Sequence, residues 1–158
     1  MQIKHLTLQA PDLIQLEPFY RETLGLSITR QTDDELTIKI GNTDLKFELM
    51  PQFDGAYHIA INVPENQFSQ AVEWLTARVT PITDSTGSSI FSFPEWNAHS
   101  IYFYDPAGNV LELIARHDLP TASDKPFTSN SMLSISEVGL GAEDAPTLAS
   151  HLKAEING

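Results

Sequence analysis

The chain has 158 residues and a formal net charge of −12, from 21 acidic and 9 basic side chains. Its hydrophobic fraction of 41% suffices for a folded core of about one domain. Such an acidic chain repels phosphate backbones, so we expect no nucleic-acid partner. The absence of cysteine excludes disulfides and thiolate chemistry and favours a cytoplasmic location. No apolar run is long enough to span a membrane and no signal peptide is recognised, so we expect no membrane partner.

The first part of the chain alternates between strand-like and helix-like patterns. Residues 2–9 alternate apolar and polar side chains, which predicts a strand. A helix is expected next, with Asp12 as a plausible N-cap, a regular start near Pro18 and an end at Gly25. Three further strands are then predicted, at 26–30, 35–41 and 44–50.

The same pattern starts again at Tyr57. A strand over 56–63 precedes a helix whose apolar residues have helical spacing. Short strands are expected near residues 80–83, 88–93, 99–104 and 109–115. The order β-α-β-β-β therefore occurs twice, at residues 2–50 and 57–115, and duplicated units of this kind usually pack against each other.

The remaining residues predict a linker and an extension. Residues 117–132 are rich in Pro, Ser, Asp and Thr, which is typical of a linker. Residues 133–158 look like a strand and a helix that begin a third copy, with Glu137 where the first two copies carry a histidine. We therefore expect a main domain over 1–116, a linker, and a partial third module.

Four strands, the first and last of each copy, carry one imidazole or carboxylate on their less apolar face. These residues are His5, Glu48, His58 and Glu112. Two imidazoles and two carboxylates that converge would suit a divalent metal such as Zn, Ni, Fe, Mn or Co. A cation would also explain why Glu112 stands between two leucines, because it would supply the missing counter-charge. The alternative for each residue alone is a packed histidine or a solvated glutamate.

These segments resemble the vicinal oxygen chelate superfamily, which includes glyoxalase I, extradiol dioxygenases, fosfomycin-resistance transferases and bleomycin-resistance proteins. The resemblance rests on three stretches: KHLTLQAPDL with FYRETLGL, YHIAINV, and IYFYDPAGNVLEL. It implies an α+β fold in which two paired βαβββ modules form an incompletely closed eight-stranded barrel around a metal.

The resemblance also implies a ligand set and a chemistry. The four ligands of small bacterial glyoxalase I match His5, Glu48, His58 and Glu112. The implied activity is that of a metal-dependent lyase or isomerase, acting on a small substrate that chelates the metal through vicinal oxygens. The metal would act as a Lewis acid, and Glu48 or Glu112 would move a proton.

Two alternatives stay open. An extradiol ring-cleaving dioxygenase would hold Fe(II) through His5, His58 and Glu112, so only Glu48 favours the glyoxalase set. Tyr102 lies where such dioxygenases place an active-site tyrosine, although the histidine that their signature has well upstream of it is missing. The other alternative is a metal-free binding protein like the bleomycin-resistance members, although these usually lack the four ligands.

The substrate side of the site is less specific. Phe93 and Trp96, with Tyr102, would wall a pocket for an apolar or aromatic small molecule, or would simply belong to the core. The sequence has no cluster of basic residues placed to bind the carboxylates of glutathione. This weakens the case for glyoxalase I activity itself. Because glyoxalase-type members often exchange modules between subunits, a homodimer is a further expectation.

Overall fold

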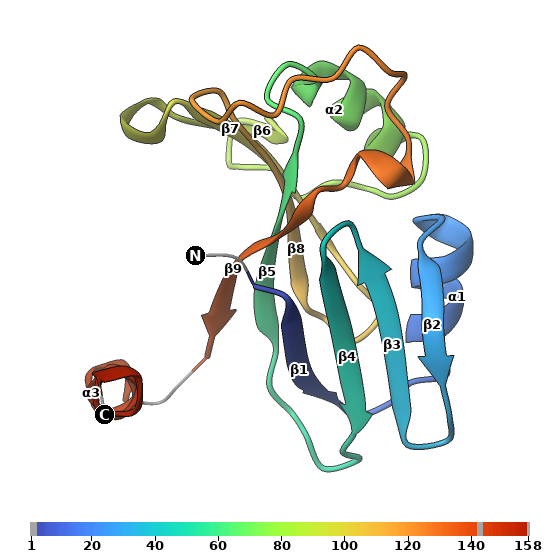
Figure 1. The fold of residues 1–158 in the computed structure, drawn as a ribbon, viewed down its shortest axis with the longest axis vertical. Coiled ribbons are helices and arrows are strands. Elements are labelled where there is room, and N and C mark those ends of the chain that lie inside the picture. Colours follow the sequence, from blue (N-terminus) through green and yellow to red (C-terminus); the bar gives the residue numbers. More distant parts are fainter. Residues whose placement is uncertain (1–2, 142–143, 158) are drawn as a thin grey trace.

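Two sheets and a few short helices make up the fold. The computed structural model describes residues 3–141 and 144–157. The first sheet has the order β1-β4-β3-β2 and the second has the order β6-β7-β8-β5-β9 (Figure 1). The strands are β1 (His5–Ala10), β2 (Ser27–Gln31), β3 (Glu35–Ile40), β4 (Thr43–Leu49), β5 (Tyr57–Val63), β6 (Ile90–Phe93), β7 (Ala98–Tyr104), β8 (Val110–Arg116) and β9 (Ser134–Leu140).

The helical elements are short apart from the last one. They are α1 (Leu16–Pro18) with the π-helical turn η1 (Phe19–Thr23), α2 (Phe68–Thr76), the 3₁₀ turns η2 (Pro94–Trp96) and η3 (Ser129–Ser131), and α3 (Ala145–Asn157). Helix α3 lies to one side of the two sheets (Figure 1). Across the described ranges, no helix is both long and apolar enough to cross a membrane.

The duplicated βαβββ unit predicted from the sequence is confirmed, as is the α+β class. In each module the first and last strands pair in parallel, β1 with β4 and β5 with β8, and the other strands pair antiparallel. The sheets do not close into a barrel. One apolar face of each sheet enters a shared core, which contains residues of both modules such as Leu45, Phe47, Ile59 and Leu111. The opposite faces carry the polar side chains.

Three local expectations need correction. The first helix begins at Leu16, before Pro18, because proline is tolerated within the first turn, and it continues as a π-helical turn. Asp12 accepts a hydrogen bond of 2.8 Å from the Ile14 backbone N–H and does not cap that helix, whose N-cap residue is Gln15. Residues 80–83 form no strand. They run beside β7 and are joined to it by a 2.8 Å hydrogen bond from the Ile82 N–H to the Tyr102 carbonyl.

The strand of the expected third copy extends the second sheet. β9 pairs antiparallel with β5, and Glu137 lies opposite Ala60. The segment before it crosses to the first module, where the Asn42 N–H donates 2.8 Å to the Leu133 carbonyl. Gly41 makes this crossing possible, because a Cβ at that position would lie 2.1 Å from the Leu133 oxygen.

The DPAGN turn between β7 and β8 connects distant parts of the fold. Asp105 Oδ1 accepts hydrogen bonds from the backbone N–H groups of Ala107 and Asn109, both at 2.9 Å. The Asn109 side chain donates 2.8 Å to Asp105 Oδ2 and accepts 2.9 Å from the N–H of Tyr57 at the start of β5. This motif therefore has a structural role: it fixes β8, and with it Glu112, relative to β5.

Candidate functional site

His58 and Glu112 form a pair at the centre of the second sheet. His58 on β5 lies opposite Val110 and Glu112 on β8 lies opposite Ala60, so the two side chains are diagonal neighbours on one face. His58 Nε2 and Glu112 Oε2 are 2.7 Å apart. The Glu112 side chain is 4% exposed and the His58 side chain 34% exposed, so the imidazole lies between the buried carboxylate and solvent.

Two hydroxyl groups from β7 surround the same carboxylate. The buried Ser100 hydroxyl donates a short hydrogen bond to Glu112 Oε1, leaving Oε2 to His58. Tyr102 lies opposite Glu112, and its ring centroid is 6.0 Å from that of His58. Burial, and next the negative charge of Glu112, raise the pKa of Tyr102 to about 12. Tyr102 is therefore a protonated hydrogen-bond donor at neutral pH. Ser100 was not predicted from the sequence, although its alternation with Tyr102 places both residues on one face.

Aromatic side chains from β6 and η2 continue this face. The Phe91 ring meets Tyr102 edge-on, with centroids 5.1 Å apart. Phe93 packs on Ala60, Ala98 and Ile114, and its ring stacks with Trp96 at 5.7 Å. Phe93 and Trp96 line a cavity of about 460 Å³ at the end of the sheet.

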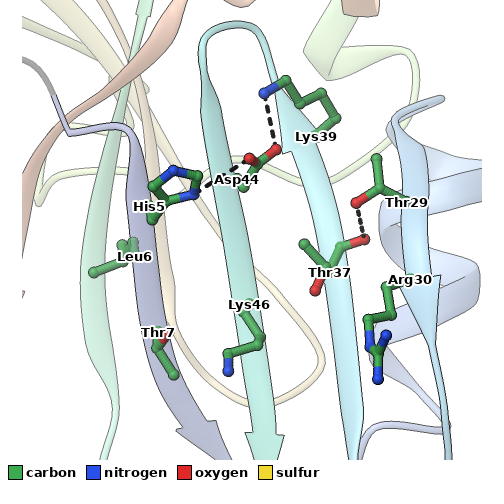
Figure 2. Close-up of a pocket in the computed structure, with 9 residues that line it drawn as sticks. All are labelled: His5, Leu6, Thr7, Thr29, Arg30, Thr37, Lys39, Asp44 and Lys46. Carbon is green, nitrogen blue, oxygen red and sulfur yellow. Dashed lines mark hydrogen bonds and ion pairs between the residues drawn. The ribbon is translucent and has the colours of Figure 1, made fainter.

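His5 lies on the open face of the first sheet. Its side chain is 81% exposed, and Nδ1 is 3.3 Å from Asp44 Oδ2. Asp44 also binds Lys39 Nζ at 2.8 Å, and this ion pair lowers the pKa of the Asp44 carboxyl. Figure 2 shows these residues along one face of β1, β4, β3 and β2. They line a shallow pocket of about 670 Å³, to which the first module alone contributes residues.

Glu48 is placed apart from His5. It lies opposite Gln9, whereas His5 lies opposite Asp44, four residues earlier on β4. Four residues along a strand correspond to about 13 Å. Glu48 instead forms a 2.6 Å ion pair with Lys46. In the second module, Glu112 comes two residues after Val110, the partner of His58. In the first module, the residue two positions after Asp44, the partner of His5, is Lys46. Lys46 therefore occupies the position in the first module that corresponds to Glu112.

The structure thus brings together two of the four predicted ligands. His58 Nε2 and Glu112 Oε2 converge on one point and form a donor pair of the kind that divalent first-row metals accept. His5 and Glu48 bind other partners. In the part of the chain that the structure describes, no three His, Asp or Glu side chains gather as a metal site. The residues present in one chain therefore fit half of the expected coordination set.

The chain belongs to the Glyoxalase/Bleomycin resistance protein/Dioxygenase superfamily, whose sequence profile matches residues 2–113. This confirms the family resemblance derived from the sequence. A search of curated proteins found no match.

Solved structures support the fold. The chain is similar to a lactoylglutathione lyase from Agrobacterium tumefaciens at 22% identity, over 70% of this chain and 90% of that one, with a TM-score of 0.56. It is similar to the oxidase ChaP-H2 at 24% identity, over 73% and 94%, with a TM-score of 0.56. The chain is also similar to a protein from Bacillus subtilis described as a dioxygenase, at 19% identity and with a TM-score of 0.65. The similarity covers 98% of this chain and 54% of that one. At these identities the likeness establishes the fold alone.

Proposed function

We propose that this protein is a divalent-metal-dependent enzyme acting on a small molecule with two neighbouring oxygens, bound on the face of the second sheet. The observation that supports this most directly is the 2.7 Å approach of His58 Nε2 to the buried Glu112 carboxylate. A buried carboxylate needs a positive partner or strong donors, and a cation held by this pair would provide one. The metal, when bound, would supply Lewis-acid polarisation of the substrate oxygens.

The chain's own residues have separate roles in this proposal. Ser100 orients Glu112 by donating to Oε1, so that Oε2 points toward His58. Tyr102, protonated because its pKa is raised to about 12, would donate a hydrogen bond to a substrate oxygen on which negative charge develops. Glu112 would accept or return a proton at the neighbouring carbon. Phe93 and Trp96 would enclose the apolar part of the substrate.

A third protein ligand would come from His5 of a second copy of the chain. The 81% exposure of the His5 side chain and the open face around it leave this imidazole accessible to another molecule. This extends the expected homodimer: the first module of one copy would cover the His58–Glu112 face of the other. Glu48 would have to leave Lys46 to join the set, so we propose it only as an additional, exchangeable ligand or base.

The same geometry bears on the choice between reaction classes. The lyase or isomerase assignment depends on Glu48 as a fourth ligand, and its ion pair with Lys46 weighs against that role. A set of two histidines and one carboxylate is the facial triad that suits Fe(II) oxygen chemistry. Ring cleavage of a catechol-like substrate is therefore the second candidate, favoured specifically by the separation of Glu48 from His5. Metal-free binding of a small molecule is the remaining alternative.

Metal titration tests the centre. Chelator-treated protein would be titrated by calorimetry with Zn, Ni and Mn, and with Fe(II) under anaerobic conditions. We expect binding that is lost in His58→Ala and Glu112→Ala and kept in His99→Ala, whose side chain lies on the opposite face of β7. Binding that is unchanged in the first two variants would refute the centre, and no binding of any metal would favour the metal-free alternative.

Mixing experiments test the contribution of a second copy. If His5 and His58 of different copies share a site, mixing His5→Ala with His58→Ala protein restores about a quarter of the sites, because half of the dimers are mixed and each has one intact site. If both act within one chain, mixing restores nothing. Oxygen uptake with catechol and isomerisation of the methylglyoxal–glutathione adduct then separate the two reaction classes.

A further inference from the structure

We propose that the cavity at Phe93 and Trp96 is a preformed subsite for a flat aromatic group, uncharged or cationic, that belongs to an elongated ligand. The inference rests on the proposed function only in assigning the reacting end of that ligand to His58 and Glu112. The subsite itself stands on the geometry of η2 and β6, and it narrows the substrate from any small molecule to an aryl-substituted one.

The aromatic rings of this subsite are accessible to a ligand. Trp96 is 57% exposed, although tryptophan is a large residue that is usually well buried. Its ring stacks with that of Phe93 at an interplanar angle of 22°, and the cavity beside them measures about 460 Å³. A pocket of a few hundred Å³ takes a ring system of drug-like size. The other tryptophan, Trp74, is already in contact with Arg78 and Phe127.

The turn that carries Trp96 is fixed. Asn97 has a φ of 43°, in the left-handed region that asparagine tolerates better than other non-glycine residues. Three contacts hold it: its N–H donates 3.2 Å to Pro94 O, its carbonyl accepts 2.9 Å from the His117 N–H, and its side chain donates 2.7 Å to Asp118. These three contacts fix the backbone of the turn that carries Trp96. The aromatic surface is therefore held in place before any ligand arrives.

The subsite is continuous with the face that carries His58 and Glu112. Phe93 lies on small residues, Ala60 and Ala98, on the face that also carries His58 and Glu112. Phe91 and Tyr102 fill the interval between the two places. Ala98 and Tyr102 are four residues apart on β7, which corresponds to about 13 Å. A ligand that reaches both places must therefore be elongated and apolar in its middle section.

The charge of the subsite and of the chain is negative. Glu95 lines the cavity, and the whole chain carries a net charge of −12. An anionic ring substituent would be repelled, whereas a neutral ring would stack on Trp96 and a cationic one would gain a cation–π contact. The subsite therefore discriminates by charge as well as by shape.

The subsite is tested alone with 2-naphthol, which has no vicinal oxygens. In Trp74→Phe protein, where Trp96 is the single tryptophan, we expect 2-naphthol to change the fluorescence and to bind at least fivefold more tightly than cyclohexanol. Naphthalene-2-sulfonate should bind more weakly than 2-naphthol, and Glu95→Gln should reduce that difference. Trp96→Ala, a change of an exposed side chain that removes the fluorescent reporter, should abolish naphthol binding as measured by calorimetry. No fluorescence change, or equal binding of cyclohexanol, would overturn the proposal.

The link to the reactive pair is tested with piceatannol, a catechol joined through a two-carbon bridge to a second ring. We expect it to bind at least tenfold more tightly than catechol to the wild-type protein, and we expect Trp96→Ala to reduce the ratio of the two affinities to about one. Naphthol binding in His58→Ala protein separates the two hypotheses. If naphthol still binds to His58→Ala protein while no metal binds to the wild-type protein, the subsite is supported and the metal centre is refuted. If metal binds normally but naphthol does not, the subsite is refuted.

Discussion

The Tyr20 hydroxyl donates a 3.0 Å hydrogen bond to Asp105 Oδ2, joining two residues 85 positions apart in the sequence. Tyr20 lies in the helical turn of the first module and Asp105 in the turn that precedes β8 of the second. Both are buried, and the Asp105 carboxylate also binds the turn that holds Glu112 in place. The Asp105 side chain thus contacts the core of the first module through Tyr20 and also holds the turn before Glu112.

Removing this hydroxyl should destabilise the fold. Tyr20→Phe leaves the ring in the core but deprives the buried carboxylate of a donor, a loss of about 1.5–3 kcal/mol for a bond to a charged group. Tyr104→Phe is the matched control, because that tyrosine is 56% exposed and should change stability by less than about 0.5 kcal/mol. Urea unfolding of both variants measures the difference. Equal stability of the two variants would show that the Tyr20–Asp105 bond contributes nothing.

The same carboxyl predicts a pH dependence. Burial raises the pKa of Asp105 above its ordinary value of 3.8. The folded chain therefore holds this proton more tightly than the unfolded chain, and stability falls as the pH rises from 3.8 through the folded-state pKa. Asp105→Asn cannot titrate, so its stability deficit relative to wild type should be largest below pH 3.8 and shrink as the pH rises. Urea unfolding at a series of pH values measures it, and a deficit that grows with pH would reverse the sign argued here.

Gly41 provides a test of the crossing between the modules. Its φ is 51°, and an added Cβ would lie 2.1 Å from the Leu133 carbonyl oxygen, which is backbone and cannot move aside alone. Gly87 has a φ of 86° but no atom within 4 Å of the same added carbon. Gly87→Ala should therefore cost only the backbone strain of about 1–2 kcal/mol, and Gly41→Ala clearly more. Thermal unfolding compares them. A similar loss in both would mean that residues 132–133 do not pack against this turn.

Hydrophobic alternation predicted the duplicated modules because each strand has one face in the core, and that face reads directly as a period of two. The π-helical turn at Phe19–Thr23 and the pairing of β9 with β5 were not predicted, because both depend on contacts with distant residues. The DPAGN motif carries part of the family resemblance in the sequence, but its structural role was not predicted: its side chains connect three separate elements.

The relative register of the parallel strands explains why Glu48 does not meet His5 in the way that Glu112 meets His58. In the second module Glu112 is two residues beyond the partner of His58, and in the first module Glu48 is four beyond the partner of His5. A shift of two residues keeps every side chain on the same face, so the alternating pattern is identical for both registers. The sequence therefore predicts correctly which face carries His5 and Glu48, but not how far apart along the strands they lie.

The electrostatic coupling between Tyr102 and Glu112 can be measured directly in chelator-treated protein. Burial, with a further contribution from the charge of Glu112, raises the pKa of Tyr102 from 10.0 to about 12. Glu112→Gln removes that charge, so the pKa of Tyr102 should fall toward 10. Ultraviolet titration of tyrosinate absorbance, with Tyr102→Phe subtracted to isolate this residue from the other three tyrosines, would report the change.

The sign of the linked stability effect follows from the same shift. Because the folded chain keeps the Tyr102 proton more tightly, wild-type stability decreases between pH 10.0 and about 12, and Tyr102→Phe should lack this part of the decrease. A cation bound at His58 and Glu112 would neutralise the carboxylate and lower the pKa of Tyr102 in the way that Glu112→Gln does. Adding Zn to wild-type protein should therefore shift the tyrosinate titration downward, and Ser92→Ala, on the other face of β6, should leave the shift intact. A titration curve that zinc does not move would separate Tyr102 from the metal centre.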